Sequence, residues 1–237
     1  MPWTPNVRIP DQLSKATPAL SLFVGNQLHM VHLGDSSNIL WHSRTEGIFW
    51  TRNVPIPNQL SKAPPALGSL GDPGTTNERL HLVHLGDSSN MLWHSIYDRS
   101  SWSPNVPIPN QLSKAAPALA ADLGGRLHLV HLGDSSNMLW HSIYDGTGWS
   151  PNVPIQNQLS KAAPALAEYA GDVHLVHLGD SSNMLWHSIY DRGRWSPNVP
   201  IPNQLSKAAP ALSTFALVLD LVHLGDSSNN LWESRWS

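Results

Sequence analysis

Histidine, aspartate and tryptophan recur through this chain at fixed spacings, and these are the residues that could do chemistry. The string His-Leu-Gly-Asp-Ser-Ser-Asn occurs five times, and a further histidine stands three residues before four of the copies. Imidazole and carboxylate groups this close in sequence suggest metal binding or proton transfer. On a β-strand, however, residues i and i+3 point to opposite faces, so one strand cannot chelate with both histidines. We therefore expect no metal site and no other cofactor.

The candidate binding residues fall into four sets with one member per copy of the string. The histidines that open the string are His32, His84, His131, His177 and His223, and its aspartates are Asp35, Asp87, Asp134, Asp180 and Asp226. The tryptophans that follow it are Trp41, Trp93, Trp140, Trp186 and Trp232, and those that open a second string, Trp-x-x-Asn-Val, are Trp3, Trp50, Trp102, Trp149 and Trp195. A single-copy active site needs unique residues, and this chain has scarcely any, so we expect no catalytic residues.

Repeated tryptophan, histidine, aspartate, asparagine and serine suit the binding of sugars. A pyranose stacks its apolar C–H face on an indole ring and needs planar polar groups for its hydroxyls. Weak equivalent sites on one rigid body gain affinity together on a multivalent surface. We expect the Trp41 set to be the more buried and the Trp3 set to be the more accessible. The structural alternative is that the aspartate accepts hydrogen bonds from its own turn and that the histidines are satisfied interior groups.

These residues belong to five copies of one unit, which together cover nearly the whole chain. The histidines that open the string are 52, 47, 46 and 46 residues apart. We divide the single domain 1–237 into repeats at 3–49, 50–101, 102–148, 149–194 and 195–237. Internal repeats of 40 to 50 residues are typical of propellers and solenoids.

Each unit predicts four short strands and no helix. In the third unit, an apolar stretch at 116–120, a run at 127–132, an aromatic stretch at 139–144 and a proline-bearing segment at 149–155 are separated by turn signals. Prolines place the last segment at a sheet edge and interrupt every candidate helix. Four strands per repeat predict an all-β, five-bladed β-propeller with four antiparallel strands per blade. The chain ends where the last outer strand is due, so Trp3 to Ile9 is expected to supply it and close the ring, with Trp236 duplicating the position of Trp3.

The composition narrows the partners. The 237 residues carry 14 basic and 17 acidic side chains, a net charge of -3, which provides no field for nucleic acid. No apolar run reaches the roughly 20 residues of a membrane span, so membrane insertion is not expected. There is no cysteine, hence no disulfide framework. No signal peptide is recognisable, which is consistent with the cytoplasm or with release by a non-classical route. The sequence leaves the oligomeric state open between a monomer and a small homo-oligomer.

Five tryptophan-rich units of this length resemble the tandem-repeat β-propeller lectins. The five-bladed tachylectin architecture is the nearest, and that resemblance implies binding of N-acetylated amino sugars between blades. The Leu-Gly-Asp-Ser-Ser-Asn-x-Leu-Trp unit looks closer to repeats of fungal and bacterial propellers of the fucose-binding and sialidase-like kinds, and its turn resembles their Asp-box. The arginine-plus-glutamate pair of the fungal fucose lectins does not recur in each unit, which favours amino sugars over fucose.

The sequence thus predicts a multivalent, non-catalytic lectin and haemagglutinin whose partners are glycans or glycoproteins. Two alternatives stay open. One is a propeller that serves as a protein-interaction scaffold, which a large exposed apolar patch would favour. The other is a sialidase-like glycosidase, which the lack of unique carboxylate pairs opposes.

Overall fold

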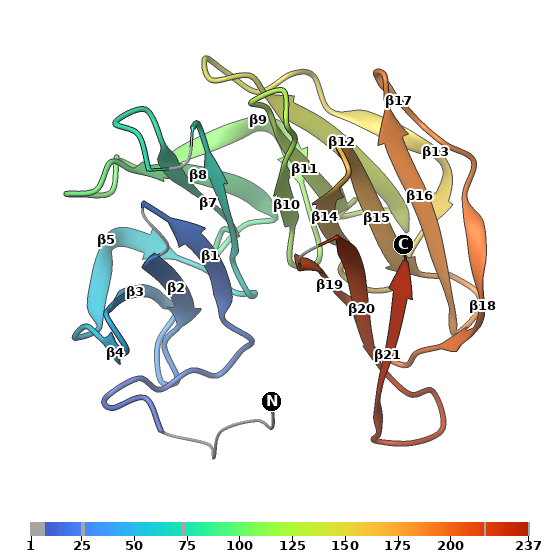
Figure 1. The fold of residues 1–237 in the computed structure, drawn as a ribbon, viewed down its shortest axis with the longest axis horizontal. Coiled ribbons are helices and arrows are strands. Elements are labelled where there is room, and N and C mark those ends of the chain that lie inside the picture. The colour runs from blue at the N-terminus through green and yellow to red at the C-terminus, as the bar shows by residue number, and fades with distance from the viewer. Residues whose placement is uncertain (1–7, 25–26, 73, 216, 237) are drawn as a thin grey trace.

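The computed structural model describes residues 8–24, 27–72, 74–215 and 217–236, in which the strands form five antiparallel sheets. Each sheet is one blade, and we number the blades one to five along the chain. The sheets are arranged around a central axis with their first strands innermost (Figure 1). The predicted all-β, five-bladed propeller is confirmed. Four blades have four main strands, and the fifth has three in the described part of the chain.

Strands with the same place in the blade have similar sequences. The innermost strands are β1 (Ala19–Phe23), β6 (Ala66–Leu70), β10 (Ala118–Ala121), β14 (Ala165–Tyr169) and β19 (Ala211–Phe215). The second strands are β2 (Gln27–Leu33), β7 (Arg79–Leu85), β11 (Leu127–Leu132), β15 (Asp172–Leu178) and β20 (Val218–Leu224). The third strands are β3 (Ile39–Glu46), β8 (Met91–Tyr97), β12 (Met138–Tyr144), β16 (Met184–Asp191) and β21 (Leu231–Trp236). The outer strands are β5 (Val54–Leu60), β9 (Val106–Leu112), β13 (Val153–Leu159) and β18 (Val199–Leu205), and two-residue strands at Phe49–Trp50 (β4) and Arg194–Trp195 (β17) precede two of them.

The strand sequences follow from the stacking of blades. All six residues of β11 are buried because a blade covers each face of this strand. In β9 only Ile108 and Gln111 are buried, and the prolines lie at the open edge, where no ladder hydrogen bond is lost. Asn110, in the same strand, has φ of 57°. This left-handed residue stands beside a register shift against β8, so the outer strand bends around the blade.

The hydrophobic core lies between blades rather than within them. One cluster joins Val31 and Leu33 of blade one to Leu80 and Leu82 of blade two, and equivalent clusters join each following pair of blades. The blades do not coincide with the sequence repeats. The third blade spans 118–159, whereas the third repeat spans 102–148. No helix in the described part of the chain is long and apolar enough to cross a membrane.

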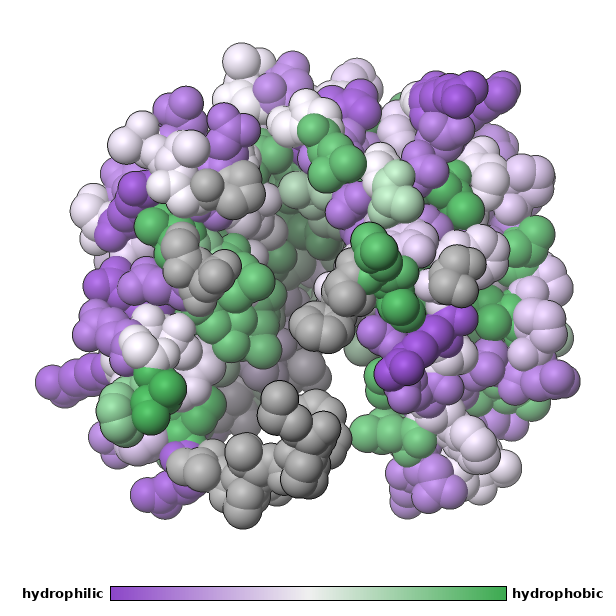
Figure 2. Space-filling model, in the orientation of Figure 1, coloured by the Kyte–Doolittle hydropathy of each residue, from purple (hydrophilic) through white to green (hydrophobic). Residues whose placement is uncertain are grey.

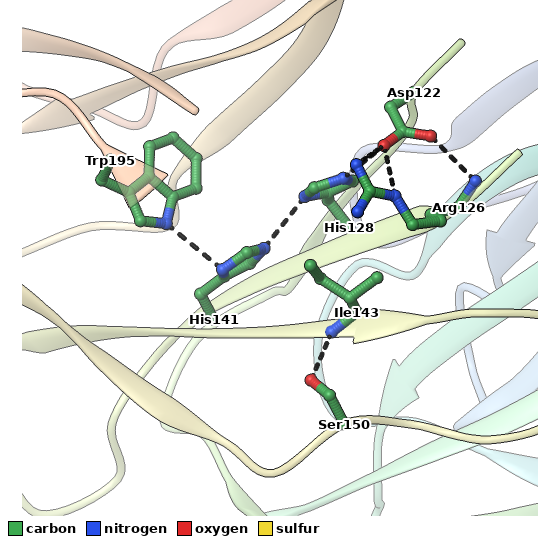
Figure 3. Close-up of polar contacts among 7 residues, drawn as sticks. All are labelled: Asp122, Arg126, His128, His141, Ile143, Ser150 and Trp195. Atoms are coloured by element: carbon green, nitrogen blue, oxygen red, sulfur yellow. Dashed lines mark hydrogen bonds and ion pairs between the residues drawn. The ribbon is translucent and has the colours of Figure 1, made fainter. Parts of the chain in front are cut away.

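Blades one to four meet at three successive interfaces. At each of them a chain of hydrogen bonds runs from a tryptophan of one blade through two histidines of the preceding blade. Trp195 Nε1 donates to His141 Nδ1 (3.2 Å), so the proton of neutral His141 sits on Nε2 (Figure 3). His141 Nε2 then donates to His128 Nδ1 (3.0 Å), and His128 Nε2 donates to Asp122 (3.2 Å). The indole belongs to blade four and both histidines to blade three. The other two interfaces have the same tryptophan–histidine bond. Trp102 Nε1 donates to His42 Nδ1 (3.3 Å), and Trp149 Nε1 donates to His94 Nδ1 (3.2 Å).

A tyrosine of the next blade packs on each of these histidine pairs. Tyr190 lies 4.9 Å from both His128 and His141, measured between ring centroids. On the fourth blade Trp236 takes this place, 4.9 Å from His187. Its strand partner is Leu219, just as Tyr144 pairs with Leu127. The expectation that Trp236 duplicates the position of Trp3 is therefore wrong, because Trp236 stands at the tyrosine position of the repeat.

The expected closure by Trp3 to Ile9 falls mostly outside the described residues, since residues 1–7 are not described. The segment that follows them behaves as the end of an outer strand. Asp11 has φ of 54° where the other outer strands have asparagine, and Gln12 accepts a hydrogen bond from Ser43 (3.0 Å) where Gln111 bonds Ser142 (2.7 Å). Ser14 bridges Gly34 as Ser61 bridges Gly86. Residues 11–16 thus sit on blade one as each outer strand sits on the following blade.

A cavity of about 200 Å³ between blades four and five has the contacts that an indole meets at the other interfaces. His187, Val199 and Trp236 are among its lining residues. Trp3 precedes Gln12 by nine residues, the same spacing as Trp102 before Gln111. Trp3 lies outside the described residues, so closure of the ring by the N-terminal strand stays a prediction.

If the N-terminal strand closes the ring, deleting residues 2–10 should lower the free energy of unfolding by several kcal/mol, out of the ~5–15 kcal/mol typical of a domain, because an edge of the last blade is then left unpaired. Thermal unfolding followed by circular dichroism measures the effect. Trp3→Ala should reproduce much of the loss, whereas Ile48→Ala, at a side chain that is 88% exposed, should be neutral. An unchanged melting temperature in the deletion variant contradicts the closure.

Acid should destabilise the fold. Burial lowers the pKa of His94 and His187 to about 4, and burial together with the neighbouring histidine lowers that of His42, His81 and His141 to about 3. The unfolded chain, with pKa near 6.5, binds more protons than the folded one below that pH, so stability falls as the pH drops from about 6.5 towards 4. Each such histidine costs on the order of 1–2 kcal/mol at pH 5, and a few of them lower the melting temperature by about 10 °C or more relative to pH 7. Equal melting temperatures at pH 7 and pH 5 would contradict these buried, neutral pairs.

Candidate functional site

Three grooves with the same construction lie between successive blades on the outer side of the ring. Groove A, between blades one and two, has a volume of about 570 Å³ and is lined by Pro57, Asn58, Leu60, Asp87, Ser88, Ser89, Trp93, Trp102, Ser103, Pro104 and Asn105. Groove B, between blades two and three, has about 560 Å³ and is lined by Pro109, Asn110, Leu112, Gly133, Asp134, Ser135, Ser136, Trp140, Trp149, Ser150, Pro151 and Asn152. Groove C, between blades three and four, has about 370 Å³ and is lined by Gln156, Asn157, Leu159, Gly179, Asp180, Ser181, Ser182, Trp186, Pro197 and Asn198. Each groove thus combines one outer strand with the hairpin and tryptophan of the next blade.

The first tryptophan of each groove is set by the hairpin glycine. A Cβ atom added to Gly133 would lie 2.8 Å from Trp140 Nε1 and 2.8 Å from Ser136 Oγ. Such contacts are too short for any residue with a side chain, so glycine lets the indole lie against the turn. The same clash would occur at Gly86 with Trp93 and at Gly179 with Trp186. This packing explains why a glycine opens the hairpin before every such tryptophan.

The second tryptophan is held from the other side by the preceding blade. Trp149 lines groove B while its Nε1 donates to the buried His94. Trp102 lines groove A in the same way, above His42. Because its only hydrogen-bond donor is engaged, the ring is fixed in orientation and offers the groove an apolar surface.

The predicted site histidines lie beneath the grooves and do not line them. His84, His131 and His177 are almost fully buried, and Nε2 of each lies 3.3 Å from the side chain of Asn105, Asn152 or Asn198. Burial lowers the pKa of these three histidines to about 4, so they are neutral at physiological pH. Each of these histidines positions an asparagine that lines a groove. They lie on the strand face opposite the histidine pairs, as the His-x-x-His spacing predicts.

The predicted aspartates line the grooves and also join blades. Asp87 accepts a hydrogen bond from Asn38 of blade one, and Asp180 accepts one from Asn137 of blade three. The partner therefore comes from the preceding blade, whereas the structural alternative placed it in the aspartate's own turn. Asp226 repeats the bond with Asn183, and Asp134 has no described bond of this kind.

The structure brings the predicted residues together only in part. Asp87, Trp93 and Trp102 share groove A, Asp134, Trp140 and Trp149 share groove B, and Asp180 and Trp186 share groove C. The expected contrast between the two tryptophan sets is absent, since both are partly buried, apart from Trp232, which is 54% exposed. Trp3 lies outside the described residues. The remaining predicted residues, at positions that line none of these three grooves, are His32, Asp35, Trp41, Trp50, Trp195, His223, Asp226 and Trp232.

Sequence reasoning missed the asparagines of the grooves. Asn58, Asn110 and Asn157 lie on the outer strands with positive φ, and each of them lines one groove. The signal was available, because asparagine recurs in each outer strand and is among the residues that tolerate this backbone conformation. Within the described ranges, no group of three or more histidine, aspartate or glutamate side chains is placed to hold a metal ion.

No protein-family model and no curated protein matches the sequence. The structure is similar to that of the fungal lectin of Aleuria aurantia, a six-bladed β-propeller with a fucose recognition mode, at 13% identity and a TM-score of 0.73 over 94% of this chain and 76% of that one. It is also similar to the SapL1 lectin solved with α-methyl fucoside, at 15% identity and a TM-score of 0.67 over 93% of this chain and 76% of that one.

An enzyme is among the similar structures as well. The exo-β-1,3-galactanase of Phanerochaete chrysosporium matches at 10% identity and a TM-score of 0.59, over 89% of this chain and 56% of that one. At such identities the similarity establishes the fold alone. The chain has five blades, and its β-propeller fold is similar to that of these lectins, as its repeats led us to expect.

Proposed function

We propose that the protein is a multivalent, non-catalytic lectin that binds terminal sugars in the grooves between its blades. The observation that carries the proposal is the threefold recurrence of a groove that combines an indole with an aspartate, an asparagine amide and serine hydroxyls. An apolar ring beside planar polar groups fits the apolar face and the hydroxyls of a pyranose. The similar structures named above include lectins that bind fucose, which supports the sugar-binding class. They lend no support to the preference for N-acetylated amino sugars, so fucose and N-acetylglucosamine are both tested.

The grooves do not favour the glycosidase alternative. Hydrolysis of a glycosidic bond ordinarily needs two carboxyl groups, about 5–10 Å apart, on either side of that bond. Each groove is lined by one aspartate and by no glutamate. A lone carboxylate beside an indole is suited to accept a hydroxyl proton in a hydrogen bond and to hold the sugar in place.

The scaffold alternative has one observation in its favour. Leu22, within β1, is 58% exposed, and Leu123 and Leu217, on loops between the first and second strands of their blades, are 77% and 83% exposed. Hydrophobic surface is visible around the central opening on the face shown in Figure 2. These leucines lie away from the grooves, so substitutions there separate the two functions.

Titration calorimetry with fucose and with N-acetylglucosamine should give weak binding at about three equivalent sites, one per complete groove, since the sites are separate and act independently. Asn110→Gly together with Ser135→Ala should reduce the number of sites to about two and leave the remaining affinity unchanged. Glycine accepts the positive φ of Asn110, so this variant keeps its fold. Leu123→Ser is the matched control and should bind as the parent does.

Multivalent binding should appear as haemagglutination or retention on glycan beads, and it should survive a chelator. If calorimetry gives one site in the parent and the groove B substitutions abolish it, the proposal of several equivalent sugar sites is contradicted. Loss of a protein partner in Leu123→Ser, with no glycan binding by the parent, would favour the scaffold.

A further inference from the structure

Each of the three grooves carries a negative charge from one aspartate. Asp87, Asp134 and Asp180 each line one groove, and within the described chain no lysine, arginine or histidine lines any of the three. A groove therefore offers a carboxylate, amides and hydroxyls to its ligand and no cationic donor. The surrounding network does not neutralise the carboxylate, since no ion pair to these aspartates occurs among the described residues.

The nearest repeated cation reaches a groove aspartate only through an asparagine amide, since Asn137 accepts a hydrogen bond from Lys114 and donates one to Asp180. The lysine after each outer strand donates to the asparagine of the next hairpin, as Lys62 does to Asn90 (2.6 Å). Lys114 and Lys161 make the same bond to Asn137 and Asn183. Each ammonium group thus holds the hairpin in shape, and it does not belong to the lining of the groove.

This arrangement fits a neutral sugar and opposes an acidic one. A carboxylate or sulfate ester on a sugar needs a cationic partner, most often an arginine fork, to replace the water it loses. Two like charges about 4 Å apart repel by ~1 kcal/mol in water and by several times more at a protein surface. We infer that the grooves select uncharged or cationic terminal sugars and reject sialylated, uronate or sulfated ones. The inference rests on the proposed sugar-binding function.

The test compares ligands that differ in charge. Beads displaying fucose or N-acetylglucosamine are set beside beads displaying the monosulfated form of each sugar, at low and at high salt. Binding to the sulfated beads should be at least tenfold weaker at low ionic strength. The difference should shrink at about 0.5 M salt, because screening shortens the range of the repulsion. Glucosamine, which carries an ammonium group, should bind at least as well as its acetylated form.

A variant locates the effect in the grooves. In Asp87→Asn, Asp134→Asn and Asp180→Asn combined, the amide oxygen still accepts the hydrogen bonds from Asn38 and Asn137 while the charge is removed. The ratio of neutral to sulfated binding should fall to about twofold or less. Asp72→Asn, at an exposed carboxylate away from the grooves, should leave the ratio unchanged. Since the salt dependence of the parent measures the same repulsion, the inference stays open to refutation even if the triple variant is unstable.

The binding results distinguish charge selection by the grooves from sugar binding itself. Binding of the sulfated sugars as tight as or tighter than that of the neutral ones overturns the charge selection and leaves the lectin function standing. No binding to any of the displayed sugars overturns the function itself.

Discussion

The hydrogen bond from an indole to the histidine of the neighbouring blade is the contact on which the rest of the structure depends. An indole has one donor and no acceptor, so it fixes the tautomer of His141, which in turn fixes that of His128. Both imidazoles are then neutral and have their acceptors occupied. At the interface between blades three and four each donor of this chain meets an acceptor, and an unpaired buried group there would cost about 1–3 kcal/mol. The blades are thereby joined by directional contacts as well as by apolar packing.

The same indole forms a wall of the groove, so the contact that joins two blades also sets the shape of the groove. Trp149 is anchored inward by His94 and presents its other side to groove B. A ring fixed in this way loses little conformational freedom when a ligand stacks on it. Asn152 is held in a comparable manner by the buried His131. Buried histidines that line no groove thus determine the geometry of the groove surface.

The repeat made the fold predictable, because periodic turns and prolines define strands independently of what packs on them. Leu127 to Leu132 could be assigned to a strand covered on both faces from its apolar pattern alone. The partners across blades could not be derived in this way. That His128 bonds His141 depends on the strand register, and that Trp195 completes the chain depends on which face of the next blade is turned inward. Asp180 was predicted to be a binding residue and lines groove C, while its bond to Asn137 joins positions 43 residues apart.

The last blade shows what happens where the chain of histidines is missing. Asp220 and Glu233 stand at the two histidine positions, and Arg235 bonds Asp220 (2.9 Å) and Glu233 (2.8 Å). The three replacements are chemically consistent, since two carboxylates at these positions need one shared cation. Arg235 is largely exposed, and exposed ion pairs contribute little to stability. Among the described residues, the last blade therefore does not offer the first blade the pair of buried histidines found at the interfaces from blade one to blade four. The contacts of Gln12 and Ser14 with blade one support the predicted closure of the ring by the N-terminal segment.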